Sequence, residues 1–293
     1  MHKSDHGTKQ GVVTKEGSVT NARERVCFRR RRELSGVEVR TVENSSNPWR
    51  SYSTGFEFLA PSTWQGEVWH RRRNTVLGSG QVLCAQPGEV FLARSVIKPG
   101  AFSSVSVDAC VLDEYVAEQR ALSRPLALRA FARMSHALAT KLDAVVRTVG
   151  PGATELELES CMVDFVAALA DELLDLAAMP APRTDSDSRA AERVRERLHD
   201  DPAANVDLTT LAAHAGMSRF RALRVFKRRF GLPPHTYQLG WRVGLARQSL
   251  RQGIEPARVA VEYGFVDQSH LTRHFKRLLG VTPAQYARIG NAA

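Results

Sequence analysis

The sequence has few cysteines, no long apolar run and no apolar N-terminal segment, and each absence excludes a class of protein. Its four cysteines, Cys27, Cys84, Cys110 and Cys161, form no CxxC pair for zinc or redox chemistry. Scattered thiols fit a reducing cytoplasm, and we expect them to be small buried side chains. Nowhere do about 18 apolar residues run together, which argues against a membrane-spanning helix. Met1–His6 lacks the apolar segment of a secretion signal, so we expect a cytoplasmic protein without membrane contact.

Catalytic and metal-binding arrangements are also missing. His270 and His274 are four residues apart but lack the adjacent glutamate of an HExxH site. His70, the one histidine between residues 34 and 112, stands beside three arginines and is a poor metal ligand. We find no pairing of a nucleophile with a base and no glycine-rich phosphate loop. The expectation is a protein that is not an enzyme, with no catalytic residue, no metal and no cofactor.

The positive charge of the chain is concentrated at one end. The formal net charge is +10. From Ser188 onward there are 18 Lys and Arg residues against 8 Asp and Glu, whereas the first 187 residues hold 23 of each. A basic module beside a neutral one indicates a polyanion-binding domain joined to a domain with another task.

The pattern along the chain divides it into four parts. Residues 1–33 are polar and end in an arginine run, which predicts a largely disordered lead. In residues 34–179, short β-type runs with Gly and Pro turns up to residue 112 predict a sandwich or barrel. Helical periodicity in residues 125–148 and 154–178 then predicts a helical hairpin. Residues 180–188 are a polar linker, and residues 189–290 form the basic domain. The fold class is therefore α+β with an all-α C-terminal domain.

The basic domain contains an internal repeat. Phe226–Tyr237 recurs 49 residues later as Phe275–Tyr286, with six of twelve positions identical. Before each copy stands a short apolar helix that ends in glycine, a turn capped by Ser218 or Asp267, and a basic helix. A short helix, a turn with glycine and a longer helix outline a helix-turn-helix, which is here present twice.

Spacing orients the two basic helices. Apolar residues share one face of each, Ala222, Val225, Phe226 and Phe230 in the first and Leu271, Phe275 and Leu278 in the second. Arginines lie on the opposite faces, and arginine can pair with the guanine edge in the major groove. Residues near the start of such a helix reach bases, while later Lys and Arg meet phosphate. We therefore expect base contacts from Phe220, Arg221, Arg224, Gln268, Ser269 and Arg273, and backbone contacts from Ser218, Lys227, Arg228, Lys276 and Arg277.

Between the two units, Pro234–Arg251 has the pattern of a helix of 18 residues. At 1.5 Å per residue it is about 27 Å long, close to the ~34 Å of one DNA turn. One chain could then read two successive major-groove segments.

Residues 190–290 resemble the DNA-binding domain of the AraC/XylS family of transcription regulators. The signature is Gly264–Arg277, followed by Gly280, Pro283 and Tyr286. The resemblance implies two helix-turn-helix units and binding to double-stranded promoter DNA. It places Arg224 and Arg273 on the family's base-contacting arginines, with Gln268, Ser269 and Thr272 beside the second. Ala222 departs from the family, which usually has leucine there.

The neutral part resembles, more weakly, the cupin-like domain that such regulators often carry before their DNA-binding domain. This implies a small-molecule effector or dimerisation, with RNA polymerase as a further partner if the protein is an activator. Trp49, Trp64 and Trp69 could line an effector pocket or pack in the core. The effector-binding residues stay unknown.

The function expected from the sequence is a dimeric, effector-controlled, sequence-specific transcription regulator. A second possibility is a regulator without a ligand, whose N-terminal domain only dimerises or binds a partner protein. An enzyme fused to a DNA-binding tail and a nonspecific architectural DNA protein are the remaining alternatives.

Overall fold

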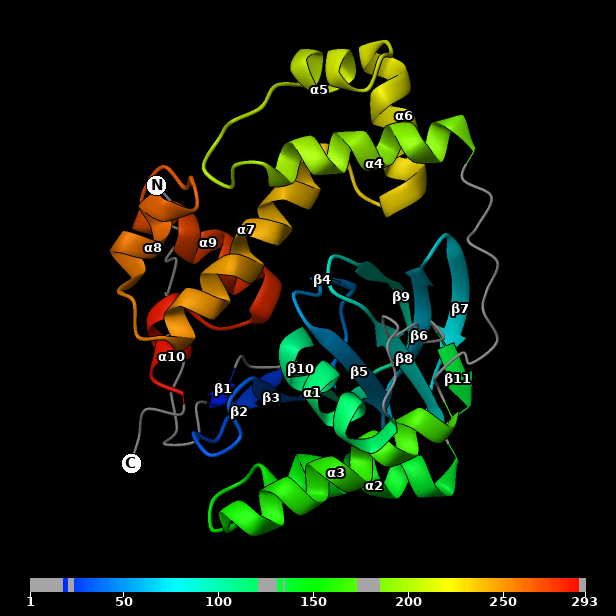
Figure 1. The fold of residues 1–293 in the computed structure, drawn as a ribbon, viewed down its shortest axis with the longest axis vertical. Helices are drawn as coiled ribbons and strands as arrows, with labels where there is room; N and C mark the ends of the chain where they lie inside the picture. Colours follow the sequence, from blue (N-terminus) through cyan, green and yellow to red (C-terminus); the bar gives the residue numbers. More distant parts are fainter. Residues whose placement is uncertain (1–17, 21–23, 121–130, 134, 173–184, 290–293) are drawn as a thin grey trace, which may run out of the picture.

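The computed structural model describes residues 18–20, 24–120, 131–133, 135–172 and 185–289 (Figure 1). The start of the expected helix at 125–148, the end of the one at 154–178 and most of the 180–188 linker lie outside these residues. The order of elements is a β-rich part, three helices around it, and a helical part, as the sequence predicts.

The strands form two antiparallel sheets. Seven strands make one sheet in the order β1-β2-β3-β10-β5-β8-β11, and four make the other in the order β4-β9-β6-β7. Their bounds are β1 (Ser18–Thr20), β2 (Arg25–Arg29), β3 (Val37–Ser45), β4 (Trp49–Tyr52), β5 (Phe56–Pro61), β6 (Gln65–His70), β7 (Arg73–Leu77), β8 (Gln81–Ala85), β9 (Val90–Lys98), β10 (Gly100–Val107) and β11 (Phe131–Arg133). The sandwich or barrel expected from the sequence is confirmed.

The larger sheet is buried on both faces because its side chains alternate. On β8, Leu83 and Ala85 pack in the core shared with the smaller sheet, whereas Val82 and Cys84 pack in a second core under the helices. This second core includes side chains of α2 (His136–Thr148) and α3 (Glu155–Glu172), which lie at the bottom of Figure 1. A further helix, α1 (Ala109–Arg120), directly follows β10.

Two sequence expectations for this part are wrong in their bounds. Phe131–Arg133 is not helical but pairs with β8 as β11, and α2 starts at His136, where the Ser135 hydroxyl accepts a hydrogen bond from the Leu138 amide. Residues 24–33 are not a disordered lead, since β2 pairs with β3 and buries Val26, Cys27 and Phe28. Partners distant in sequence decide both cases.

The helical part follows the predicted order. Its helices are α4 (Ser186–His199), α5 (Leu208–His214), α6 (Arg219–Phe230), α7 (Pro234–Arg251), α8 (Pro256–Glu262), α9 (Gln268–Leu279) and α10 (Pro283–Ala287). The pairs α5/α6 and α8/α9 are the two helix-turn-helix units, and α7 runs between them (Figure 1). Asp185 caps α4, so its first turn begins inside the expected linker.

The β-rich part and the helical part share a core. One apolar cluster contains Phe91 and Phe102 from the strands together with Val243 and Ala246 from α7. Glycines let this helix approach the strands closely, because a Cβ on Gly244 would lie 2.3 Å from Cγ2 of Thr54. The two parts are therefore packed together rather than merely tethered.

Candidate nucleic-acid interface

In both units the basic helix begins with a side-chain cap and follows a turn that contains glycine. The Ser218 hydroxyl accepts from the Arg221 amide at the start of α6, and the Asp267 carboxylate accepts from the His270 amide at the start of α9. In the preceding turns, Gly216 and Gly264 have φ of +67° and +69°, which disfavours any side chain there. These features fix where each basic helix begins.

Helix α6 has the buried and exposed faces that its spacing predicts. Ala222, Val225, Phe226 and Phe230 are buried, and Ala222 has no exposed surface. On the opposite face, Phe220 is 84% exposed, and Arg224 and Lys227 are exposed without an ion pair to any residue that the structure describes. An aromatic ring and two cations are thus open to a ligand.

Two other arginines of α6 share one carboxylate. Nη2 of Arg221 lies 2.8 Å from Oδ1 of Asp187, and Nη2 of Arg228 lies 2.6 Å from Oδ2. Arg229 pairs with Glu192 at 2.9 Å. Both acids belong to α4, so this helix holds one flank of α6. The sequence patterns did not point to Asp187, because the pairs join residues 34 and 41 positions apart.

Helix α9 exposes most of the side chains that the sequence assigns to DNA contacts. Gln268, Ser269, Arg273, Lys276 and Arg277 are exposed, Thr272 is half-buried, and Leu271 and Phe275 are buried. Leu278, expected to point inward, is half-buried, and Leu279 takes the fully buried place beside it.

The histidines of α9 belong partly to its core. His274 is buried, and the rings of His270 and His274 lie 4.6 Å apart. Burial, then the neighbouring His270 and arginines, lowers the pKa of His274 to about 4. The side chain is therefore neutral near pH 7, which keeps the cationic face of α9 to its arginines and lysine.

Polar side chains on α7 hold both units. The buried Arg242 donates to the carbonyl of Gly264 at 3.0 Å, in the turn of the second unit, and to the carbonyl of Ala204 at 2.9 Å, before the first unit's α5. Gln238 donates to the same Ala204 carbonyl. Because one side chain ties both units to one helix, α7 sets their separation.

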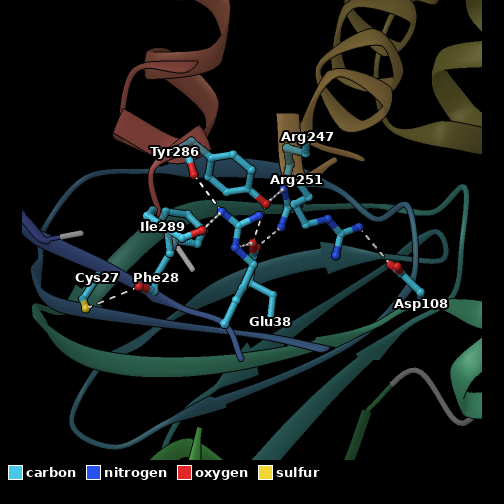
Figure 2. Close-up of polar contacts among 9 residues, drawn as sticks. Cys27, Phe28, Glu38, Asp108, Arg247, Arg251, Tyr286 and Ile289 are labelled. Atoms are coloured by element: carbon cyan, nitrogen blue, oxygen red, sulfur yellow. Dashed lines mark hydrogen bonds and ion pairs between the residues drawn. The ribbon is translucent and has the colours of Figure 1, made fainter. Parts of the chain in front are cut away.

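A buried charge cluster joins the β-rich part to the helical part, and Figure 2 shows it beneath α7 and α10. Glu38 of β3 is 1% exposed and accepts hydrogen bonds from Arg247 and from the hydroxyl of Tyr286. Nearby, Arg251 pairs with Asp108 at 3.0 Å. Burial opposes the ionisation of Glu38, but Arg247 and then the neighbouring arginines hold its pKa below the ordinary value.

Arg30 and Arg31, which the sequence places in a disordered lead, are instead engaged in contacts with other segments. Arg30 donates to the carbonyl of Tyr286 at 2.7 Å, and its Nε lies 3.7 Å from Glu38. Arg31 donates to the carbonyl of Gly150 at 3.0 Å. No signal in the sequence linked these arginines to partners more than 100 positions away.

A cluster of aromatic rings lies in the core shared by the two sheets. Trp64 is fully buried, and Trp49 packs within 6 Å of Trp64, Phe91 and Phe102. These tryptophans therefore pack as core residues. His70 bonds Glu89 at 3.0 Å, and no metal-type cluster of His, Cys, Asp or Glu occurs within the described residues.

The four cysteines differ in exposure. Cys27 and Cys84 are buried as expected, but Cys161 is half-buried and Cys110 is exposed. Among the described helices, none is both long and apolar enough to cross a bilayer.

Comparison with known proteins identifies the helical part. A family described as a helix-turn-helix domain matches residues 211–289. A Streptomyces antibioticus protein described as AraC-like transcription regulator is 37% identical over 92 residues, 31% of this chain and 30% of its own. The transcriptional regulator YbfI of Bacillus subtilis is 34% identical over 96 residues, 33% of each chain. The match thus spans about a third of the length of these relatives.

The likeness in fold extends further than the likeness in sequence. A solved structure of an apo ToxT variant from Vibrio cholerae aligns with 88% of this chain and 98% of its own, at a TM-score of 0.50 and 11% identity. At this identity the likeness concerns the arrangement of strands and helices alone.

Proposed function

We propose, from the premise that residues 211–289 form a helix-turn-helix domain of the AraC type, that the chain reads promoter DNA with α6 and α9 in successive major grooves. The observation that carries the proposal is the pair of helices, each with a buried apolar back and an exposed arginine on its outer face. Helix α7, 18 residues and about 27 Å long, is suited to space them about one DNA turn apart.

Roles follow from position on each helix. Base edges are read by Phe220, Arg224, Gln268, Ser269, Thr272 and Arg273, and the backbone is held by Ser218, Lys227, Lys276 and Arg277. Arg221 and Arg228, which the sequence also predicts at the DNA, are paired with Asp187 and must leave it before they can reach DNA. Of the two α6 arginines that the sequence assigns to bases, Arg224 is therefore the one that is open without prior rearrangement.

The experiment is selection of binding sites from random duplex DNA with the full chain, at near-physiological salt, where backbone attraction is weakened. Two short motifs about one helical turn apart are expected. The matched control is the double variant Arg224→Ala, Arg273→Ala, which keeps most of the positive charge and should enrich no motif. Enrichment of the same motifs by the control, or of none by the wild type, would contradict the assigned readout.

For the N-terminal part, we infer control by a small effector in a homodimer, with RNA polymerase as a further partner if the regulator activates. Because Trp49 and Trp64 pack in the core, we look for the effector at a site outside this aromatic cluster. A cavity of about 320 Å³ lies between the two parts, lined by Trp69, Arg71 and Glu89 on one side and Arg195 and Phe230 on the other. A ligand there would touch both parts and could couple them.

The packing of Trp49 against Trp64 and Phe102 in the core also favours the second candidate, a regulator without a ligand whose N-terminal part dimerises or binds a protein. Thermal shifts with fractionated metabolite pools separate the two. An effector in the cavity should raise the melting temperature of the wild type and of Arg197→Ala, which does not line the cavity, but not of Arg195→Ala. No shift with any pool favours the ligand-free regulator.

A further inference from the structure

The two helix-turn-helix units differ in charge at equivalent places. Asp187 is the second residue of α4, and its counterpart in the second unit is His235, the second residue of α7. Arg221 and Arg228 of α6 correspond in the same way to His270 and Arg277 of α9. The first unit thus has a carboxylate where the second has an imidazole.

The carboxylate of Asp187 is placed to hold two cations at once. Arg221 and Arg228 are seven residues apart, so they lie about two turns apart on one side of α6. Their side chains converge on the two oxygens of Asp187 at 2.8 and 2.6 Å. Asp187 is 23% exposed while each arginine is about half exposed, at 53% and 50%. Hydrogen bonds from Arg221 and then Arg228 lower its pKa, which keeps it charged.

Arg224 lies between these two arginines along the helix but stays apart from the pairing. It is exposed and makes no ion pair with a residue in the described part of the chain. On α9, Arg277 instead contacts the ring of His274 at 3.2 Å, and none of Arg273, Lys276 or Arg277 pairs with a described acid. The phosphate-binding charge of the first unit is therefore partly neutralised and that of the second is not.

We propose that Asp187 is a specificity-determining residue of the first unit, which keeps Arg221 and Arg228 from the DNA backbone and leaves Arg224 to act on base edges. The inference rests on the proposed DNA-binding function. Phosphate contacts carry no sequence information, so two freed arginines would strengthen binding to any DNA. On DNA without a preferred sequence, α6 can shift until Arg221 and Arg228 both contact phosphates. At a selected site the base contacts hold α6 in one position, so the two arginines add less to the affinity there.

The test compares Asp187→Asn with the wild type on the selected site and on random duplex DNA, over a series of salt concentrations. Random DNA should bind the variant about 3- to 10-fold more tightly, as expected for two exposed ion pairs. The selected site should gain less, so the ratio of specific to nonspecific affinity falls. The plot of log affinity against log salt should steepen by about one unit for each new phosphate contact.

Asp200→Asn is the matched control, because Asp200 pairs with Arg197 at 3.3 Å at the other end of α4. It should leave both affinities unchanged. A second control makes Asp187→Asn in a background that already carries Arg221→Ala and Arg228→Ala. In this background the change should not tighten binding to random DNA. If Asp187→Asn does not fold, Asp187→Ser repeats the comparison with a residue suited to a helix start.

The outcomes separate this inference from the function on which it rests. If the wild type selects no motif, the proposed function fails first. If the wild type selects its motifs but Asp187→Asn binds random DNA no more tightly, the role of Asp187 is overturned. An equal gain in the background without the two arginines also overturns it, because the effect is then one of general charge.

Discussion

At the scale of single residues, chemistry and position separate arginines from lysines on the recognition helices. Arg224 and Arg273 occupy equivalent places, each five residues after the start of its helix and exposed. Lys227 and Lys276 follow one turn later. A guanidinium can pair with a guanine edge through two hydrogen bonds, whereas an ammonium acts as a point charge.

Arg273→Ala is expected to cost about 1–3 kcal/mol of binding free energy on the selected site and to relax base preference there. Lys276→Ala should weaken binding to all sequences about equally, because it removes a phosphate contact. Competition binding with single-base variants of the site measures both effects. If the two variants lose the same discrimination, the division of roles between them is wrong.

His199 at the end of α4 should make stability depend on pH. Its ring stacks on Trp241 at 4.2 Å, and burial, then Arg195, lowers its pKa to about 4. In the unfolded chain histidine titrates near 6.5. The unfolded state therefore binds more protons between these values, so stability is full above pH ~6.5 and declines as the pH falls toward 4.

The variant His199→Phe keeps a ring against Trp241 and should reduce this decline, measured as unfolding free energy at about pH 7.5 and about pH 4.5. His214→Phe, at an exposed position of α5, is the control and should keep the decline. If the unfolding free energy of His199→Phe falls as much as that of the wild type, another group causes the pH dependence.

At the scale of elements, local signals located the helices of the second half. Pro234–Arg251 was predicted from spacing alone and is α7 with the same bounds. The sequence did not indicate why this helix contains glycines. Gly240 and Gly244 face Tyr52 and Thr54, so a helix that is otherwise ordinary lies directly against the strands.

Gly244→Ala is therefore expected to destabilise the protein by about 1–3 kcal/mol through overpacking, although alanine favours helices more than glycine. The clash is with Cγ2 of Thr54, while Cβ of that residue is 3.8 Å away. Adding Thr54→Ala should restore stability, which denaturant unfolding of the single and double variants measures. If the second change restores nothing, α7 does not depend on this contact.

At the scale of the whole molecule, buried charges join parts that the sequence presents as separate modules. Glu38, Arg247 and Tyr286 come from the third strand, the long helix and the last helix. Removing one member leaves the others buried without a counter-charge, which costs more than an exposed ion pair.

Glu38→Gln should lower the free energy of unfolding by roughly 3–5 kcal/mol, because Arg247 and Arg30 then lose their buried counter-ion. Glu43→Gln is the control on the same strand, since Glu43 is 58% exposed and 3.9 Å from Arg25. It should change stability by less than about 1 kcal/mol. Equal effects in urea unfolding would mean that the cluster contributes no more than a surface pair.

The sequence by itself determined the two helix-turn-helix units, the connecting helix and the β-rich class of the first part. Caps such as Ser218, glycines such as Gly216 and apolar spacing act within one or two helical turns, so a local pattern specifies them. It did not place β2 or β11, because each of these short strands is decided by the strand it pairs with.

Only the tertiary structure decided which charges meet. Asp187 lies 34 residues from Arg221, and Glu38 lies 209 residues from Arg247. Sequence spacing carries no information about such pairs, since they form only when packing of the shared core brings distant elements together. The sequence therefore located the arginines of the recognition helices, and the fold decided which of them are already paired within the protein and which are open to a partner.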